Sequence, residues 1–205
     1  QGAALCCGRT YLAAGMAVEA KVRARQLLAA LAPLARRGIP IVGLEPSCLL
    51  TLRDEIQAMG LGEDATTVAG QALMFEEFVA REAQAGRFRP ALRAARQPIL
   101  VHGHCHQKAF GSVPAVLDAL RLIPGAEPSL IESSCCGMAG SFGYEAAHHA
   151  VSLQMAELSL LPAVRAAPDA LIVADGTSCR QQIADGAGRR ALHLARVLAD
   201  HLAVG

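Results

Sequence analysis

The chain has 205 residues, of which 53% are hydrophobic and 18% are charged, and its formal net charge at pH 7 is +1. This length allows one large domain or two small ones with an ordinary buried core. The charges are of mixed sign and form no basic block, which argues against a nucleic-acid partner. The apolar stretches end before the ~18 residues that a membrane span requires, so we expect no transmembrane segment.

The first part of the chain predicts a helix and a strand between cysteines. It opens with a Cys-Cys-Gly motif at 6–8. Apolar residues then recur with a period near 3.6 and predict a helix over 17–37. The dense apolar run at 39–44 predicts a buried parallel strand. Cys48 follows this strand, and we expect the next helix to open at Leu49, where its N-terminus would favour a thiolate.

The middle of the chain predicts four elements and one junction. Residues 72–85 have a helical pattern, and the Arg- and Pro-rich segment 86–97 is the most plausible junction. A strand is expected at 98–101, a helix at 113–122 and a strand at 129–132.

The last part repeats the order of the first. A second Cys-Cys-Gly motif at 135–137 precedes a predicted helix over 144–166 and a predicted strand over 170–174. Cys179 follows, and we expect the next helix to open at Arg180. The lone cysteine again lies where open α/β sheets bind their ligands, beyond the carboxyl end of a strand.

The matching motifs indicate a duplication. The second cysteine of the doublet precedes the lone cysteine by 41 residues in the first copy (48 minus 7) and by 43 in the second (179 minus 136). The second copy also has Cys105, 30 residues before its doublet, and the equivalent position in the first copy would precede residue 1. We therefore expect a truncated first repeat at 1–88 and a complete second repeat at 89–205. Alternating strands and helices predict an α/β fold with two pseudo-repeated lobes and mainly parallel sheets flanked by helices.

The seven cysteines suit metal binding better than disulfides. Their number is odd and adjacent cysteines rarely bridge each other, so we expect a reducing compartment, either the cytoplasm or its membrane surface. Thiolates select iron–sulfur clusters, zinc or Cu(I). Four thiolates suit a [4Fe–4S] cluster, and a doublet reaches several irons more easily than one zinc ion. The predicted ligands are Cys105, Cys135, Cys136 and Cys179 in the second repeat, and Cys6, Cys7 and Cys48 in the first.

Glycines and histidines surround the predicted ligands. Gly137 and Gly140 would let the loop fold closely around a cluster, with backbone N–H groups facing sulfur, although a plain turn or a weak nucleotide loop is the alternative. His102, His104 and His106 alternate around Cys105, so on a strand they would share the face opposite the thiol. They could donate hydrogen bonds to cluster sulfur, couple protons, bind zinc, ligate the cluster, or simply lie at a polar strand end where the backbone satisfies their rings.

The stretches VHGHCHQKAFG, ESSCCGMAGSFGYE and VADGTSCRQQI carry a family resemblance. The chain resembles the tandem cysteine-rich (CCG) domain of heterodisulfide reductase B subunits and of the iron–sulfur subunits of glycolate, lactate and glycerol 3-phosphate dehydrogenases. It is more similar still to the C-terminal region of FAD-linked oxidases of the D-2-hydroxyglutarate or D-lactate dehydrogenase type. The heterodisulfide reductases have a fifth thiolate where this chain has Glu45 and Gly176, which disfavours their noncubane cluster.

The resemblance implies electron transfer from a flavin. An upstream FAD domain or subunit would oxidise a 2-hydroxy acid, and a ferredoxin-like module would pass single electrons to this region. The substrate site would lie outside these residues. Two other functions remain open: a structural zinc or interaction module, and a thiol–disulfide reductase. A thiol enzyme built on Cys105 and His106 would leave the other six cysteines unexplained.

Overall fold

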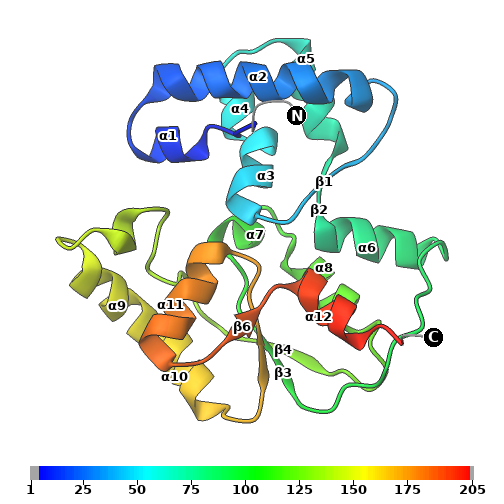
Figure 1. The fold of residues 1–205 in the computed structure, drawn as a ribbon, viewed down its shortest axis with the longest axis vertical. Helices are drawn as coiled ribbons and strands as arrows, with labels where there is room; N and C mark the ends of the chain where they lie inside the picture. Colours follow the sequence, from blue (N-terminus) through cyan, green and yellow to red (C-terminus); the bar gives the residue numbers. More distant parts are fainter. Residues whose placement is uncertain (1–4, 204–205) are drawn as a thin grey trace. The chain divides into compact units, whose positions relative to one another are not determined.

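The computed structural model describes residues 5–203, which fall into two compact units, Gln1–Met74 (unit 1) and Phe75–Gly205 (unit 2) (Figure 1). The predicted repeat boundary at 88/89 concerns the duplicated sequence and stays a prediction. Within the described range, no helix is both long enough and apolar enough to cross a bilayer.

Unit 1 packs helices against a two-stranded parallel sheet. Strands β1 and β2 pair with Ile41 opposite Ala72. Its longest helix buries a stripe of apolar side chains, including Ala20, Ala24 and Leu28, at the four-residue spacing that places them on one face. The elements are α1 (Arg9–Ala13), α2 (Ala17–Ala35), β1 (Ile41–Gly43), α3 (Pro46–Arg53), α4 (Glu55–Ala58), α5 (Glu63–Gln71) and β2 (Ala72–Met74).

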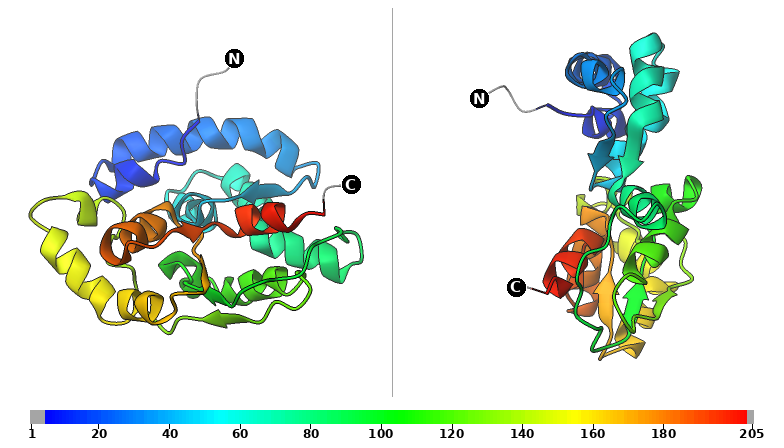
Figure 2. Two further views of the ribbon diagram at one scale, coloured as in Figure 1. Left: turned by 60° about the horizontal axis from the view of Figure 1, so that its bottom comes forward. Right: turned by 90° about the vertical axis from the view of Figure 1, so that its right-hand side faces the viewer.

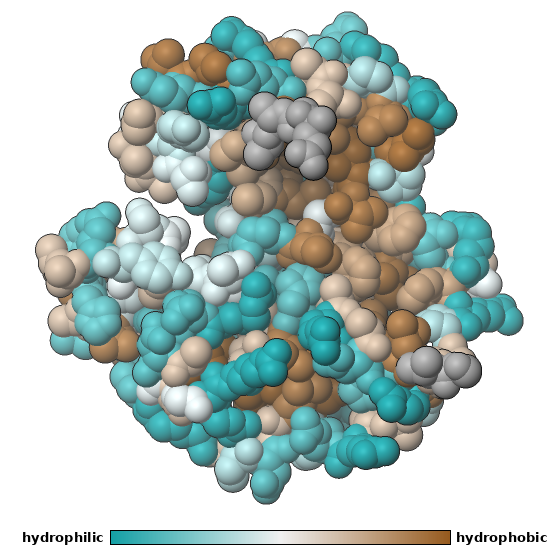
Figure 3. Space-filling view, viewed as in Figure 1, coloured by the Kyte–Doolittle hydropathy of each residue, from teal (hydrophilic) through white to brown (hydrophobic). Residues whose placement is uncertain are grey.

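Apolar side chains of unit 1 are also exposed. Val18 on α2 is 75% exposed, and Leu44, just after β1, is 52% exposed. Brown atoms lie among the teal ones over this unit in the upper part of Figure 3.

Unit 2 contains a four-stranded parallel sheet with the order β4-β3-β5-β6. Figure 2 shows helices on both sides of this sheet. The elements are α6 (Phe75–Gln84), β3 (Ile99–Val101), α7 (Cys105–Ala109), α8 (Val113–Leu120), β4 (Pro128–Leu130), the 3-10 turn η1 (Phe142–Tyr144), α9 (His149–Glu157), α10 (Leu160–Ala166), β5 (Leu171–Val173), α11 (Thr177–Ala187), β6 (Ala191–Leu192) and α12 (Leu194–His201). The predicted α/β class, with parallel sheets flanked by helices, is confirmed.

Apolar side chains on the central strands point alternately to the two faces of this sheet, which explains why helices cover both faces. Ile99 and Val101 face a core formed with α6, α8 and α12, whereas Ile172 on β5 faces a core formed with α10 and α11. Successive strand residues point to opposite faces, so these short apolar strands bury both.

The strand order fixes where a site can form. The chain passes from β3 to β4 on one side and from β5 to β6 on the other, so the direction of winding reverses between β3 and β5. In open α/β sheets, the crevice at such a switch point, beyond the carboxyl ends of the strands, binds ligands. In unit 2, Cys105 follows β3 and Cys179 follows β5.

Several element predictions were wrong in detail. Residues 72–74 form β2 rather than the start of a helix, because they pair with β1. The helix predicted over 144–166 is two helices that meet at Leu158 and Ser159. Pro162 explains the break, because it has no N–H to bond the carbonyl of Leu158 but is tolerated in the first turn of a new helix.

The helices after the lone cysteines begin earlier than predicted. The helix expected from Leu49 begins at Pro46, which suits the first helical position, and the helix expected from Arg180 begins at Thr177. Cys48 and Cys179 are therefore the third residues of their helices and not the residues before them. Their sulfurs still lie in the first turn, where the backbone N–H groups are not used by the helix.

Candidate metal centre

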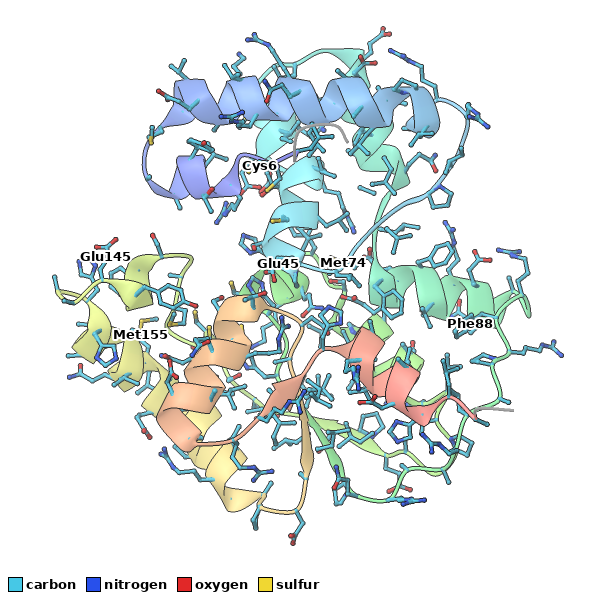
Figure 4. The ribbon with its side chains drawn as sticks, viewed as in Figure 1. Cys6, Glu45, Met74, Phe88, Glu145 and Met155 are labelled. Atoms are coloured by element: carbon cyan, nitrogen blue, oxygen red, sulfur yellow. The ribbon has the colours of Figure 1, made fainter. Side chains whose placement is uncertain are left out.

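Three loops bring four thiols together at the switch point of unit 2. Cys105 begins α7, Cys135 and Cys136 lie on the loop after β4, and Cys179 lies in the first turn of α11. Sulfur atoms gather beside the N-terminal end of α11 in Figure 4. Within residues 5–203 none of the cysteines forms a disulfide.

The four thiols are linked by contacts in the order Cys105, Cys135, Cys136 and Cys179. Contact with Cys105 lowers the pKa of Cys135, and the same contact raises that of Cys105. Contact with Cys136 lowers the pKa of Cys179, while its contacts with Cys135 and Cys179 raise that of Cys136. The sulfurs therefore share protons along this series of contacts, and metal binding would release these protons.

The Cys-Cys-Gly turn aims backbone N–H groups at sulfur. Gly137 N lies 3.3 Å from Cys135 Sγ, and the N–H of Met138 donates to Cys136. Gly137 has φ of 88°, and a Cβ there would lie 2.1 Å from the carbonyl oxygen of Ser152 on α9. Only glycine fits this turn, because it needs both a positive φ and a close approach to a helix.

Unit 1 repeats this turn. Gly8 N lies 3.4 Å from Cys6 Sγ, Gly8 has φ of 87°, and a Cβ there would lie 2.8 Å from the carbonyl oxygen of Ala20. A thiol contact with Cys48 lowers the pKa of Cys7 to about 6. Figure 4 labels Cys6 before α1 and Glu45 before α3. The structure thus brings together the three cysteines of this unit, as it does the four in unit 2.

His102 points a ring nitrogen at the cysteines. It follows β3, is 1% exposed, and its Nδ1 lies 2.9 Å from Ser133 Oγ. One ring nitrogen of His102 and the sulfurs of Cys136 and Cys179 form a group whose ligand atoms all lie within 4.8 Å of one another. The nearby ring of His102 also contributes to the lowered pKa of Cys179, after the contact with Cys136.

His104 and His106 lie differently from the prediction. The strand ends at Val101, so His104 is the N-cap of α7 and His106 is in its first turn, with the two rings stacked at 5.1 Å between centroids. The side chain of His104 fills the space next to Gly176, where a Cβ would lie 2.4 Å from its Cδ2 and 3.1 Å from Cys179 Sγ. The three imidazoles therefore share no strand face.

A buried polar network beneath the site was not predicted. Gln107 Nε2 donates to Asp175 Oδ2 at 2.9 Å and to Glu76 Oε1 on α6, while its Oε1 accepts from the backbone N–H of His104 at 2.9 Å. Burial and the nearby Asp175 raise the pKa of Glu76 to about 8. The sequence around Glu76 shows an ordinary helical pattern and gives no sign that this carboxyl group is buried, so only the fold reveals it.

Lys108 is a second residue that the sequence did not single out. Its Nζ donates to the carbonyl oxygens of Ser133 and Ser134, the latter at 3.1 Å, and thereby closes the loop before Cys135 onto α7. Burial lowers its pKa, while charge interactions with all four cysteines of unit 2 raise it. An amino group is thus placed where it interacts with all four cysteines of unit 2.

The predicted glycines differ in their surroundings. Gly137 contacts Cys135 as described, whereas Gly140 is exposed in the turn before η1, with φ of 71°. Gly143 donates its N–H to the carbonyl oxygen of Met138 at 3.0 Å and so closes this loop. A cofactor contact by Gly140 stays a prediction.

The donor set fits an iron–sulfur cluster. It combines four thiols from three loops with backbone N–H groups on two of the sulfurs, and soft thiolates of this kind select iron–sulfur clusters, zinc or Cu(I). The buried, unpartnered Nε2 of His102 adds a further donor on the inner side. The buried carboxyl group of Asp175, four residues before Cys179, is engaged by Gln107 and by the N–H of Leu194, so the thiols and not carboxylates define the site.

The part of the chain that carries the four thiols of unit 2 matches a known protein family. A family model described as a cysteine-rich domain, CCG, matches residues 99–184, the span from β3 to α11. Residues 99–184 form a cysteine-rich CCG domain. The predicted family resemblance is therefore confirmed.

The relatives that match most of the chain are named as dehydrogenases. The chain is 27% identical over 199 residues to one of the subunits of the anaerobic glycerol-3-phosphate dehydrogenase of Escherichia coli K12, covering 97% of this chain and 50% of that protein. It is 32% identical over 160 residues to D-2-hydroxyglutarate dehydrogenase of the same strain, covering 77% of this chain and 15% of that protein. The Pantoea ananatis D-2-hydroxyglutarate dehydrogenase is 30% identical over 163 residues, which is 77% of this chain and 15% of that protein. The chain spans half or less of these relatives.

Proposed function

We propose that the chain is an iron–sulfur electron-transfer region of an FAD-linked 2-hydroxyacid dehydrogenase or oxidase. The observation that carries this proposal is the convergence of Cys105, Cys135, Cys136 and Cys179 at the switch point of a CCG domain. A [4Fe–4S] cluster on these thiolates would supply one-electron transfer. The dehydrogenase names of the relatives support the reaction class.

The residues of the chain would hold and shield the centre. Cys136 and Cys179 are buried, so they form the inner side, while Cys105 is exposed and Cys135 is partly so. The N–H groups of the Cys-Cys-Gly turn stabilise thiolate sulfur. A flavin domain or subunit and a ferredoxin-like module would be the electron partners, and the oxidised acid would bind there rather than in this chain.

A structural zinc site is the second candidate. It is favoured by the compact group of His102, Cys136 and Cys179, whose ligand atoms lie within 4.8 Å of one another. Soft sulfur with one imidazole is a common zinc donor set.

Anaerobic preparation tests the first proposal. We expect the chain, reconstituted with ferrous iron and sulfide, to bind both and to give an EPR signal on one-electron reduction. Cys136→Ser with Cys179→Ser should lose most iron from unit 2, whereas Cys6→Ser with Cys48→Ser should keep it. A protein that stays free of iron after reconstitution, or that binds zinc alone, would overturn the cluster. Reduction of a disulfide substrate by the reconstituted chain would favour a thiol–disulfide reductase instead.

A further inference from the structure

We propose that His102 is a ligand of the metal centre in unit 2 and supplies Nε2 beside the sulfurs of Cys136 and Cys179. The identity of the metal, an iron–sulfur cluster, rests on the proposed function. The role of His102 as a ligand follows from the burial and position of its side chain.

The first argument is an unsatisfied donor atom. His102 is 1% exposed, and its Nε2 has no hydrogen-bond partner among the described residues. A buried polar atom left unpaired destabilises the folded state. A metal ion bound to the adjacent sulfurs would satisfy this atom.

The second argument is the spacing of the three atoms. One ring nitrogen of His102 and the sulfurs of Cys136 and Cys179 lie within 4.8 Å of one another. All three residues are buried, so a metal centre held by the two sulfurs would lie beside the imidazole.

The third argument is the partner of the other ring nitrogen. Nδ1 of His102 lies 2.9 Å from Ser133 Oγ, a hydroxyl oxygen that can accept a hydrogen bond from Nδ1–H, and this tautomer leaves the lone pair of Nε2 free for a metal. Ligating histidines commonly anchor their second nitrogen in this way. Lys108 Nζ, 3.4 Å from the same oxygen, helps to hold the hydroxyl in place.

His104 provides the contrast. Its Nδ1 accepts the backbone N–H of His106 at 3.1 Å, so the neutral ring carries its proton on Nε2. His104 can therefore donate a hydrogen bond to the centre through Nε2 but cannot bind a metal through that atom. The two buried imidazoles, two residues apart, have opposite roles.

Nitrogen hyperfine spectroscopy tests the ligand directly. The full chain is labelled with 15N only in histidine, reconstituted anaerobically with iron and sulfide, and reduced by one electron. We expect the strong 15N coupling of a coordinated imidazole, lost in His102→Gln and kept in His104→Asn, because Asn still caps α7. A wild-type signal without such coupling, or coupling that survives in His102→Gln, would overturn the proposal even if iron is bound.

Cobalt binding gives a test that does not depend on a cluster. Metal-free protein titrated with Co²⁺ should show sulfur-to-cobalt and d–d absorption, with at least tenfold weaker binding in His102→Gln than in wild type or His104→Asn. Circular dichroism of the metal-free variants confirms that they fold. Equal Co²⁺ affinity of His102→Gln and wild type would contradict the ligand, whereas absence of iron with intact Co²⁺ binding would contradict the cluster alone.

Discussion

Gln107 donates a hydrogen bond from Nε2 to Asp175 Oδ2 over 2.9 Å and so joins the helix of Cys105 to the strand end that leads to Cys179. Gln107 is fully buried, and Asp175 is 2% exposed. The same amide also bonds Glu76 and the N–H of His104. One side chain therefore sets the distance between two predicted ligand loops.

Replacement of Gln107 by leucine should destabilise unit 2. The change leaves the carboxyl groups of Glu76 and Asp175 and one backbone N–H short of partners, and each unsatisfied group costs about 1–3 kcal/mol. We expect the free energy of unfolding of the metal-free protein, measured in urea, to fall by roughly 3 kcal/mol. The matched control is Gln181→Leu on the exposed side of α11, where Gln181 bonds only Asp185. Equal stability of the two variants would contradict the role of Gln107.

Glu76 should make the stability of unit 2 depend on pH. Its pKa is about 8 in the folded protein, first because of burial and then because of Asp175, against 4.5 for an ordinary glutamate. The folded state therefore holds this proton more tightly, so the stabilisation is complete below pH 4.5 and is lost as pH rises through 8. One pKa unit corresponds to about 1.4 kcal/mol, so the loss is of the order of several kcal/mol.

Glu76→Gln should remove this dependence. The amide cannot ionise, so we expect the variant to be more stable than wild type above pH 8 and to differ less at pH 5. Urea unfolding of the two metal-free proteins from about pH 5 to about pH 9 measures this dependence. The ionisation of the thiols cancels in the difference between their unfolding free energies, because both proteins contain the same thiols. Glu127→Gln, at an exposed loop position, is the control and should run parallel to wild type. A parallel profile for Glu76→Gln would disprove the shifted carboxyl.

The sequence predicted the elements whose signal is local. The 3.6-residue period over 17–37 corresponds to α2, and the apolar run at 98–101 corresponds to β3. The spacing of the doublets identified the cysteines that the fold gathers. The break before Pro162 was missed because the apolar period continues across it, and strand β2 was missed because its pairing with β1 is tertiary.

The surroundings of the thiols could not be predicted in the same way. Gln107 and Glu76 are 31 residues apart, and Gln107 and Asp175 are 68 apart, so no periodic pattern connects them. His104 was expected on a strand, but its side chain caps α7 because the strand ends after Val101. Long-range contacts of this kind depend on strand order, which a single sequence leaves open.

Gly137→Ala should be far more damaging than an ordinary glycine change. A positive φ disfavours alanine by ~1 kcal/mol, and the added Cβ would also meet the carbonyl oxygen of Ser152 at 2.1 Å. Gly188, with φ of 60° and nothing within 4 Å of a Cβ, is the matched control. We expect Gly188→Ala to lower the free energy of unfolding by about 1 kcal/mol and Gly137→Ala by roughly 3 or more, with loss of bound iron. Equal effects in urea unfolding would show that the close approach to α9 is unimportant.

Lys108 should raise the reduction potential of the proposed iron–sulfur cluster. Its ammonium lies beside all four cysteines of unit 2, and a nearby positive charge stabilises the additional electron. We expect Lys108→Met to lower the midpoint potential by the order of 50 mV, since ~1.4 kcal/mol corresponds to about 59 mV for one electron. Lys108→Arg keeps the charge and should restore most of the shift, and Lys21→Met, the only other lysine of the chain, should change nothing. A redox titration followed by EPR makes the measurement, and a Lys108→Met potential equal to that of wild type would mean that this ammonium does not act on the centre.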